Sequence, residues 1–275
     1  MRDTTAPVIT CPTNVTLECP AVTTTNATGV ATATDAGGAV TITYADTITA
    51  NCGNTYVISR RWTATDQCNN SSTCTQTITM RDITAPVITC PADVTLEYPA
   101  VTTTNATGVA TATDTCSSVT ITFVDSVTNG CGGSKTIARR WTATDLCGNS
   151  SSCTQTITVR DTTSPVITCP PSVTLECPAV TTINATGIAT ATDASGSVAI
   201  TYVDTITAGC GNTYTITRRW TATDPCNNAS SCTQTITIRD LTAPVITCPP
   251  SVTLECPADT TTNSTGVATA TDGCG

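Results

Sequence analysis

The chain has 275 residues, of which 3% are aromatic and 11% charged, with 18 cysteines, no histidine and a net charge of −9. An acidic chain without a basic stripe is unsuited to binding nucleic acid, and no apolar run of 18 residues is present that would span a membrane. Without histidine or cysteine pairs at metal-site spacing, we expect no enzyme. So many cysteines indicate disulfides and an extracellular or cell-surface location.

A ten-residue segment, Arg-Asp-Thr-Thr-Ala-Pro-Val-Ile-Thr-Cys in its first copy, recurs with small changes at Arg2, Arg81, Arg160 and Arg239, a period of 79 residues. Self-similarity at a fixed period of this length is typical of a string of folded modules. We predict three repeats and the first half of a fourth, which is either cut from a longer protein or completed by a neighbouring subunit. The predicted repeats are residues 2–80, 81–159, 160–238 and 239–275.

About a quarter of the residues are threonine, and good helix formers are scarce, so we predict an all-β fold. In the first repeat, alternating residues separated by Gly, Asn, Asp and Pro predict strands at 8–18, 29–34, 39–44, 55–65 and 73–80. Several short strands in 79 residues favour tandem, disulfide-stapled, immunoglobulin-like antiparallel β-sandwich modules. Trp62, Trp141 and Trp220 are the expected core anchors.

Three sequence motifs carry a resemblance to a known family. Ala-Pro-Val-Ile-Thr-Cys-Pro opens a repeat, Ala-Thr-Ala-Thr-Asp lies in its middle, and Trp-Thr-Ala-Thr-Asp-x-Cys-x-Asn-x-Ser-x-Cys-Thr-Gln-Thr-Ile-Thr closes it. Together they resemble hyalin repeat (HYR) domains over the whole chain. The resemblance implies an immunoglobulin-like extracellular module, common in tandem in adhesion and surface proteins, without catalytic residues.

The cysteine positions differ between repeats. The first and third repeats have five each, whereas the second has Tyr98 at the second cysteine position and gains Cys116. A strand of about 11 residues separates Cys52 from Cys68 by more than about 30 Å, beyond the roughly 7 Å between bridged Cα atoms. We therefore expect bonds between cysteines at like ends of a repeat. Such cross-links typically contribute about 2–4 kcal/mol each to a module with a thin core.

In the hyalin-repeat resemblance, Cys11 and Cys74 belong to the opening and closing strands. The expected pairs within repeats are Cys11–Cys74, Cys19–Cys52, Cys90–Cys153, Cys116–Cys147, Cys169–Cys232 and Cys177–Cys210. Cys68, Cys131 and Cys226 remain as candidates for staples between repeats or chains, with Cys131 bonded to Cys226 if repeats stack end to end. The alternatives are free thiols, or a Cys68–Cys74 bond that releases Cys11.

Recurrent aspartates are expected at one end of each repeat, where three carboxylates could hold Ca²⁺ through oxygen ligands. The candidate calcium ligands are Asp82, Asp114, Asp145, Asp161, Asp193 and Asp224, and Asp3, Asp35 and Asp66 are their counterparts in the first repeat. The alternative is that each aspartate is a turn residue that binds its own backbone.

Asn-x-Ser/Thr sequons recur at one position in every repeat, and these asparagines are candidate glycosylation sites: Asn26, Asn105, Asn184 and Asn263. In a threonine-rich chain such matches also arise by chance. Alternating threonine rows could form an ice-binding array, but an ordinary solvent-facing strand surface explains them better.

These features favour an extracellular structural protein that builds a rigid, disulfide-stabilised fibre on a microbial surface by end-to-end self-association. The alternative function is the stalk of an adhesin whose ligand-binding tip lies elsewhere. Other surface proteins or glycans are further candidate partners.

Overall fold

The computed structural model describes residues 3–274. Met1, Arg2 and Gly275 lie outside the described residues, and with them the first residue of the first predicted repeat and the last of the fourth. The chain divides into two compact units. The first comprises the chain up to Thr95 with Val101–Thr128 and Thr136–Thr158, and the second comprises Leu96–Ala100, Asn129–Lys135 and the chain from Val159 onward.

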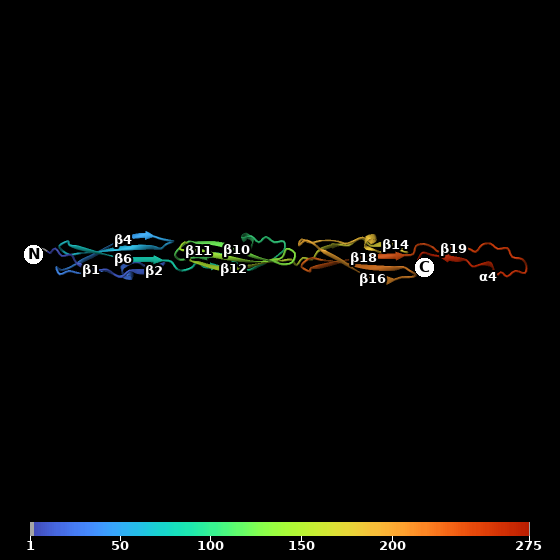
Figure 1. The fold of residues 1–275 in the computed structure, drawn as a ribbon, viewed down its shortest axis with the longest axis horizontal. Coiled ribbons are helices and arrows are strands. Elements are labelled where there is room, and N and C mark those ends of the chain that lie inside the picture. Colours follow the sequence, from blue (N-terminus) through green and yellow to red (C-terminus); the bar gives the residue numbers. More distant parts are fainter. Residues whose placement is uncertain (1–2, 275) are drawn as a thin grey trace. The chain divides into compact units, whose positions relative to one another are not determined.

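The first repeat is a sandwich of two sheets (Figure 1). In the smaller sheet β1 (Val8–Thr10) is antiparallel to β3 (Thr32–Thr34). The larger sheet has the order β2-β6-β5-β4. Its strands are β2 (Val15–Glu18), β4 (Thr41–Ala50), β5 (Tyr56–Thr65) and β6 (Ser71–Arg81).

The same two sheets recur in the second and third repeats, and the fourth has the two-stranded sheet. The second repeat contains β7 (Val87–Thr89), β8 (Val94–Glu97), β9 (Thr111–Thr113), β10 (Val119–Asn129), β11 (Lys135–Asp145) and β12 (Ser150–Arg160). The third contains β13 (Val166–Thr168), β14 (Val173–Glu176), β15 (Thr190–Thr192), β16 (Ala199–Ala208), β17 (Tyr214–Thr223) and β18 (Ala229–Arg239), and the fourth contains β19 (Val245–Thr247) and β20 (Thr269–Thr271). The prediction of an all-β chain of tandem immunoglobulin-like sandwich modules is confirmed.

Each repeat also has one helical turn of four residues before its third strand. These turns are α1 (Thr25–Thr28), α2 (Thr104–Thr107), α3 (Ile183–Thr186) and α4 (Thr262–Thr265). Within residues 3–274 no helix is long and apolar enough to cross a membrane.

The predicted strand at 29–34 is too long, since β3 covers only Thr32–Thr34, and three further details differ from the prediction. The single strand at 8–18 is wrong, because residues 11–14 carry the chain from one sheet to the other and so separate β1 from β2. The strand at 39–44 is too short, since β4 runs on to Ala50 opposite β5. One pairing is parallel, between β2 and β6. Parallel pairing needs a long connection, which here contains β3, β4 and β5.

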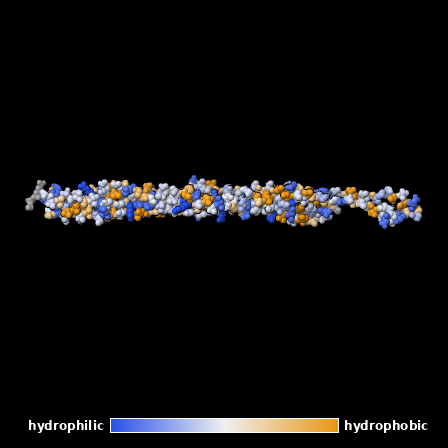
Figure 2. Space-filling model, viewed as in Figure 1, coloured by the Kyte–Doolittle hydropathy of each residue, from blue (hydrophilic) through white to orange (hydrophobic). Residues whose placement is uncertain are grey.

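The core between the sheets is narrow and contains polar groups. Trp62, Trp141 and Trp220 are each 2% exposed, so their predicted role as core anchors is confirmed. The ring of Tyr44 packs on Trp62 with centroids 5.1 Å apart. Arg60 and Gln76 are buried beside them. On the face drawn in Figure 2, hydrophobic and hydrophilic residues are interspersed.

Candidate junction sites: inter-repeat disulfides and acidic clusters

Three disulfides lie within single repeats and join the two sheets of a sandwich. Cys11, which follows β1, bonds to Cys74 in β6, with the Cα atoms 5.9 Å apart. The same bond recurs in the second and third repeats as Cys90–Cys153 and Cys169–Cys232. These three bonds are among the pairs expected from the sequence. A covalent link between the sheets supplements a core that buries few large apolar side chains.

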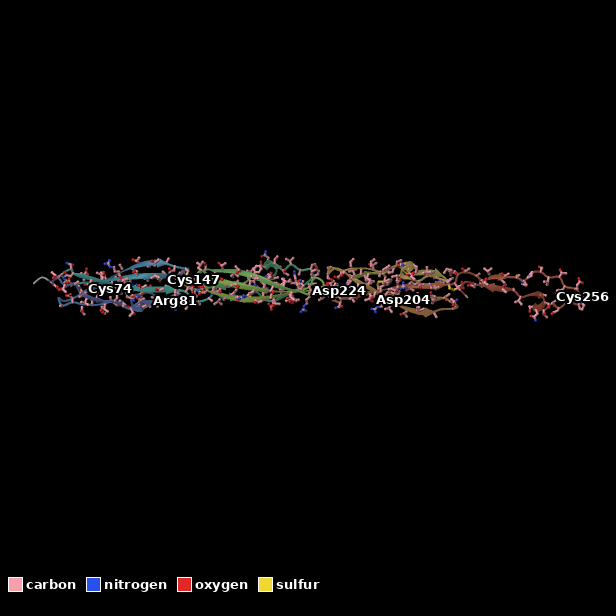
Figure 3. The ribbon with its side chains drawn as sticks, in the orientation of Figure 1. Cys74, Arg81, Cys147, Asp204, Asp224 and Cys256 are labelled. Carbon is pink, nitrogen blue, oxygen red and sulfur yellow. A yellow bond between two sulfur atoms is a disulfide. The ribbon has the colours of Figure 1, made fainter. Side chains whose placement is uncertain are left out.

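The other predicted pairs within repeats are wrong, namely Cys19–Cys52, Cys116–Cys147 and Cys177–Cys210. Within the described chain Cys210 forms no disulfide, and the other five cysteines of these pairs bond to a different repeat (Figure 3 labels Cys147). The observed bonds are Cys19–Cys116 and Cys52–Cys147 between the first and second repeats, and Cys177–Cys274 between the third and fourth.

The order of strands in the larger sheet explains why Cys19 does not bond to Cys52. Cys19 follows β2 and Cys52 follows β4, and these strands are the opposite edges of the four-stranded sheet. Three strand spacings of about 4.8 Å put the edges roughly 14 Å apart. Bridged Cα atoms lie within about 7 Å, so a bond between these two cysteines is out of reach. The next repeat instead offers Cys116 beside one edge and Cys147 beside the other.

The connection between the second and third repeats has one staple. Cys131 bonds to Cys226 with the Cα atoms 5.0 Å apart, which is the pair expected for repeats stacked end to end. The second bond is missing because Tyr98 and Ser195 occupy the cysteine positions used at the first junction. The Tyr98 ring instead lies so close to Gly133 that any side chain there would overlap it.

Within residues 3–274 four cysteines have no disulfide partner, and all four are exposed: Cys68, Cys210, Cys248 and Cys256. Cys68 is equivalent by the 79-residue period to Cys147 and Cys226, and Cys210 is equivalent to Cys52 and Cys131. Cys248 corresponds to Cys11 and Cys256 to Cys19. Every equivalent of these four cysteines elsewhere in the chain is bonded.

A glutamate at the end of the second strand of each complete repeat accepts hydrogen bonds from the first residues of the next repeat. Glu18 Oε1 accepts hydrogen bonds from the amide of Ile83 at 2.7 Å and the hydroxyl of Thr84 at 3.0 Å. Glu97 and Glu176 make the equivalent bonds to the start of the next repeat. The once-per-repeat recurrence of this glutamate is visible in the sequence and indicates a structural role, but the sequence does not reveal its partners.

The predicted acidic residues form clusters at the start of each complete repeat. Asp82, Asp114 and Asp145 present carboxylate oxygens that all lie within 4.8 Å of one another, and equivalent clusters are Asp161, Asp193, Asp224 and Asp3, Asp35, Asp66. Oxygens on opposite sides of one ion with bonds of about 2.4 Å lie up to roughly 4.8 Å apart, so this spacing suits a single calcium ion. All six predicted ligands thus lie in clusters of the right size.

Most of these oxygens also serve local turns. Asp145 Oδ1 accepts the amides of Cys147 and Asn149, and Oδ2 accepts the Asn149 side-chain amide, each at 2.8–2.9 Å. Asp114 Oδ1 accepts the Cys116 amide at 2.8 Å. The alternative prediction, that these aspartates bind the backbone of their own turns, therefore holds as well. One oxygen of Asp82, Oδ2, has no hydrogen-bond partner among the described residues.

The junction aspartates Asp82 and Asp161 are buried, each 8% exposed, and their Oδ2 atoms have no hydrogen-bond partner. Burial raises the pKa of Asp82, and the neighbouring charges of Asp114, Asp145 and Glu18 raise it further. Burial acts in the same sense on Asp145, but hydrogen bonds led by Asn149 outweigh it and lower the pKa of that carboxyl. A cation at the cluster would neutralise this uncompensated charge.

A loop of the preceding repeat covers the cluster in the second unit. The amide of Asp161 donates to Ser134 Oγ at 3.0 Å. A Cβ at Gly132 would lie 2.8 Å from Cβ of Ser195 and 3.5 Å from Asp161 Oδ2. We call residues 131–134 and the equivalent residues 52–55 the roof loops. At the first junction the amide of Asn54 donates to the carbonyl of Cys116 at 3.0 Å.

A buried arginine holds the helical turn in each complete repeat. Arg60 donates to both carboxylate oxygens of Asp46 at 2.8 and 2.9 Å and to Thr28 Oγ1 at 2.9 Å. The Thr28 hydroxyl donates in turn to the carbonyl of Thr24. Thr28 is the threonine of the recurrent sequon, so the arginine contact gives that residue a structural reason to recur. The sequon asparagines Asn26, Asn105, Asn184 and Asn263 are exposed, and their glycosylation stays a prediction.

A comparison with models of known protein families finds no match, and a comparison with curated protein sequences finds none. The hyalin-repeat resemblance therefore stays a prediction. Solved structures similar to the chain include tandem cadherin ectodomains. Protocadherin gamma B2 domains 3–6 give a TM-score of 0.31 at 14% identity over 91% of this chain and 76% of theirs. Mouse cadherin-23 EC22–24 gives 0.33 at 13% over 86% and 99%, and Drosophila N-cadherin EC1–4 gives 0.30 at 12% over 86% and 76%. Similarity at this level carries no function to the chain.

Proposed function

We propose that the chain is an extracellular structural protein whose sandwich repeats are stapled into a stiff fibre. The observation that carries this proposal is the pair of disulfides Cys19–Cys116 and Cys52–Cys147 between two successive repeats. These bonds start from opposite edges of one sheet, so they restrict rotation of one repeat about the other more than a single bond would. Disulfides of this kind persist in oxidising surroundings, which supports a location outside the cell.

The proposed partner is a repeat of the same kind, which gives end-to-end self-association. Cys68 and Cys210 support this proposal, because both are exposed and their equivalents bond to a neighbouring repeat. Cys68 is equivalent to Cys147, which bonds to the preceding repeat. Cys210 is equivalent to Cys52, which bonds to the following repeat. The further repeat is either another part of a longer chain or a second copy.

Electron microscopy of native material with and without reductant tests the fibre. We expect uniform fibres that soften or fragment when the disulfides are reduced, while a sample with blocked thiols and intact disulfides stays unchanged. Isolated particles of fixed length that never associate would contradict the fibre and favour the adhesin stalk. Mapping disulfides in the fibres would identify the partner of Cys68, and an alkylated Cys68 in intact fibres would contradict its role as a staple.

We also propose that the acidic clusters bind calcium and stiffen the junctions. The observation in favour is the pair of buried oxygens without partners, Asp82 Oδ2 and Asp161 Oδ2, each within a cluster of carboxylates. A site made of oxygen ligands alone suits calcium better than a transition metal. Calorimetric titration of the full chain, first stripped with EDTA, should show heat on addition of CaCl₂. Absence of heat over millimolar concentrations would overturn this proposal.

A further inference from the structure

We infer that the roof loop of a preceding repeat completes the cation site, so that cation binding and the docking of successive repeats stabilise each other. The inference rests on the proposed calcium sites and adds to them an order of affinity. Clusters that carry a roof loop bind the cation tightly, and the cluster of the first repeat binds it weakly unless another repeat docks on it.

The cluster of the first repeat, which has no roof loop among the described residues, can be compared with the two clusters that have one. Asp66, Asp145 and Asp224 are similarly buried, at 8%, 6% and 5% exposure, whether or not a roof loop is present. The junction aspartate alone differs, because Asp3 is partly exposed whereas Asp82 and Asp161 are 8% exposed. Among the described residues, carboxylate oxygens of the clusters that are both buried and without a partner belong only to Asp82 and Asp161.

At the second junction, the contacts of the roof loop account for the burial of Asp161. Gly132 has φ +55° and lies over the cluster, where a Cβ would approach Ser195 and Asp161 Oδ2. Ser134 Oγ accepts the amide of Asp161, which fixes the backbone of a cation ligand. The loop is in turn bonded to the cluster's own hairpin through Cys131–Cys226. The loop therefore shields the Asp161 cluster from solvent and fixes the backbone of Asp161.

Electrostatics gives the direction of the coupling. Charges that are shielded from water interact more strongly with an ion than exposed charges do. In a cluster with a roof loop the carboxylates already lie in place, and a bound cation relieves their mutual repulsion. Reciprocity then requires that a bound cation hold the roof loop, and thus the preceding repeat, in place.

Titration of the full chain with CaCl₂ and its single-site variants tests the inference. We expect two tight sites and one site that is weaker by between about 5-fold and about 150-fold, the usual range for coupled sites. Asp82→Asn and Asp161→Asn should each remove one tight site. Asp3→Asn is the matched control and should remove only the weak site.

Variants of the roof test the coupling without touching a carboxylate. Gly132→Ala should weaken the Asp161 site, because the added methyl pushes the loop away from Ser195. Gly211→Ala is its control. Gly211 has φ +56° in the equivalent loop of the third repeat, and among the described residues the fourth repeat has no complete acidic cluster for that loop to cover. Gly132→Ala also strains the backbone at φ +55°, so Ser134→Ala is a second, milder variant that removes one hydrogen bond and should weaken the same site.

The outcomes separate the two proposals. No heat in the unmodified chain would overturn both the calcium site and the roof coupling. Three sites of equal affinity, or affinities unchanged by Gly132→Ala and Ser134→Ala, would overturn the coupling and leave the calcium sites standing. Hydrogen exchange gives an independent readout, because calcium should slow exchange in residues 131–134 and leave residues 210–213 unaffected.

Discussion

A single buried arginine connects three parts of each complete sandwich. In the second repeat Arg139 donates to Asp125 at 2.8 and 2.9 Å, to Thr107 Oγ1 at 2.9 Å and to the carbonyl of Thr102 at 2.8 Å. Its side chain is 3% exposed. The hydrogen bonds of Arg139, which lies in β11, thus tie β10 to the segment around α2. A guanidinium suits this place because its fixed fork of donors reaches several acceptors at once.

Arg139→Ala should therefore lower the free energy of unfolding by roughly 3–5 kcal/mol, since it leaves Asp125 and Thr102 without their donor. Arg140→Ala is a control at the next residue, which is exposed, and should change the free energy by less than about 0.5 kcal/mol. Urea unfolding of the two oxidised variants gives the comparison. Similar losses in both would show that the buried network is not what stabilises the repeat.

The unpartnered carboxylate of Asp82 predicts a reversal of stability with calcium. Its pKa is raised by burial and then by nearby carboxylates, so the ionised form costs stability at pH values above the unfolded pKa of about 3.9. In EDTA at neutral pH, Asp82→Asn should melt at the same temperature as the unmodified chain or higher. In calcium it should melt lower, because it lacks a ligand.

Asp93→Asn is the matched control for this reversal. Asp93 accepts the amide of Thr156 at 2.7 Å, and Asn14 accepts the equivalent amide of Thr77 at the same distance in the first repeat. This control should behave the same in EDTA and calcium, and a reversal in it as well would mean that the effect reflects net charge. An Asp82→Asn variant that is less stable in both conditions would contradict the cation site.

At the scale of elements, the long alternating strands were predictable and the crossings between sheets were not. β5 and β6 follow the alternation of apolar residues closely, because each has one face on the core. β1 and β2 read as one strand, since Cys11 and Pro12 interrupt the pattern without breaking its parity. β4 extends beyond Tyr44 although its side chains there are exposed, because β5 still offers a partner strand and Arg60 binds Asp46. Burial alone therefore underestimates this strand.

The closing hairpin has a conformational requirement that varies between repeats. Asn69 and Asn227 have φ 66° and 67°, and Gly148 occupies the same position in the second repeat with φ 89°. Asn227→Gly should leave stability within about 0.5 kcal/mol, whereas Asn227→Ala should cost roughly 1–2 kcal/mol because its Cβ is unfavourable in this conformation. Thermal unfolding of the two variants tests this, and equal stability of both would contradict the backbone requirement.

At the scale of the molecule, the sequence predicts the modules and four of the seven disulfides, but not the partners of Cys19, Cys52 and Cys177. Pairing by like ends works for Cys11–Cys74, where two sheets face each other within one repeat. It fails for Cys19 and Cys52 because they leave opposite edges of one sheet, an order that alternation does not reveal. The acidic residues are easier to place, since in each repeat one opens the repeat and two lie at strand ends on that same side, and the clusters contain all six predicted ligands.

The two staples of the first junction predict a graded loss of stiffness. Cys19→Ser with Cys116→Ser, or Cys52→Ser with Cys147→Ser, leaves one bond near one edge of the sheet. Either double variant should widen the distribution of angles between the first and second repeats moderately, and the quadruple variant should widen it most, as measured in single-particle images.

Each double variant is the control for the other, because it removes one bond of similar loop length, with sequence separations of 97 and 95. If one bond stiffened the junction as much as two, the quadruple variant alone would be flexible, and the second staple would act on stability rather than on shape. Because the connection between the second and third repeats has only the Cys131–Cys226 bond, that result would mean that one staple per junction is sufficient for a stiff fibre.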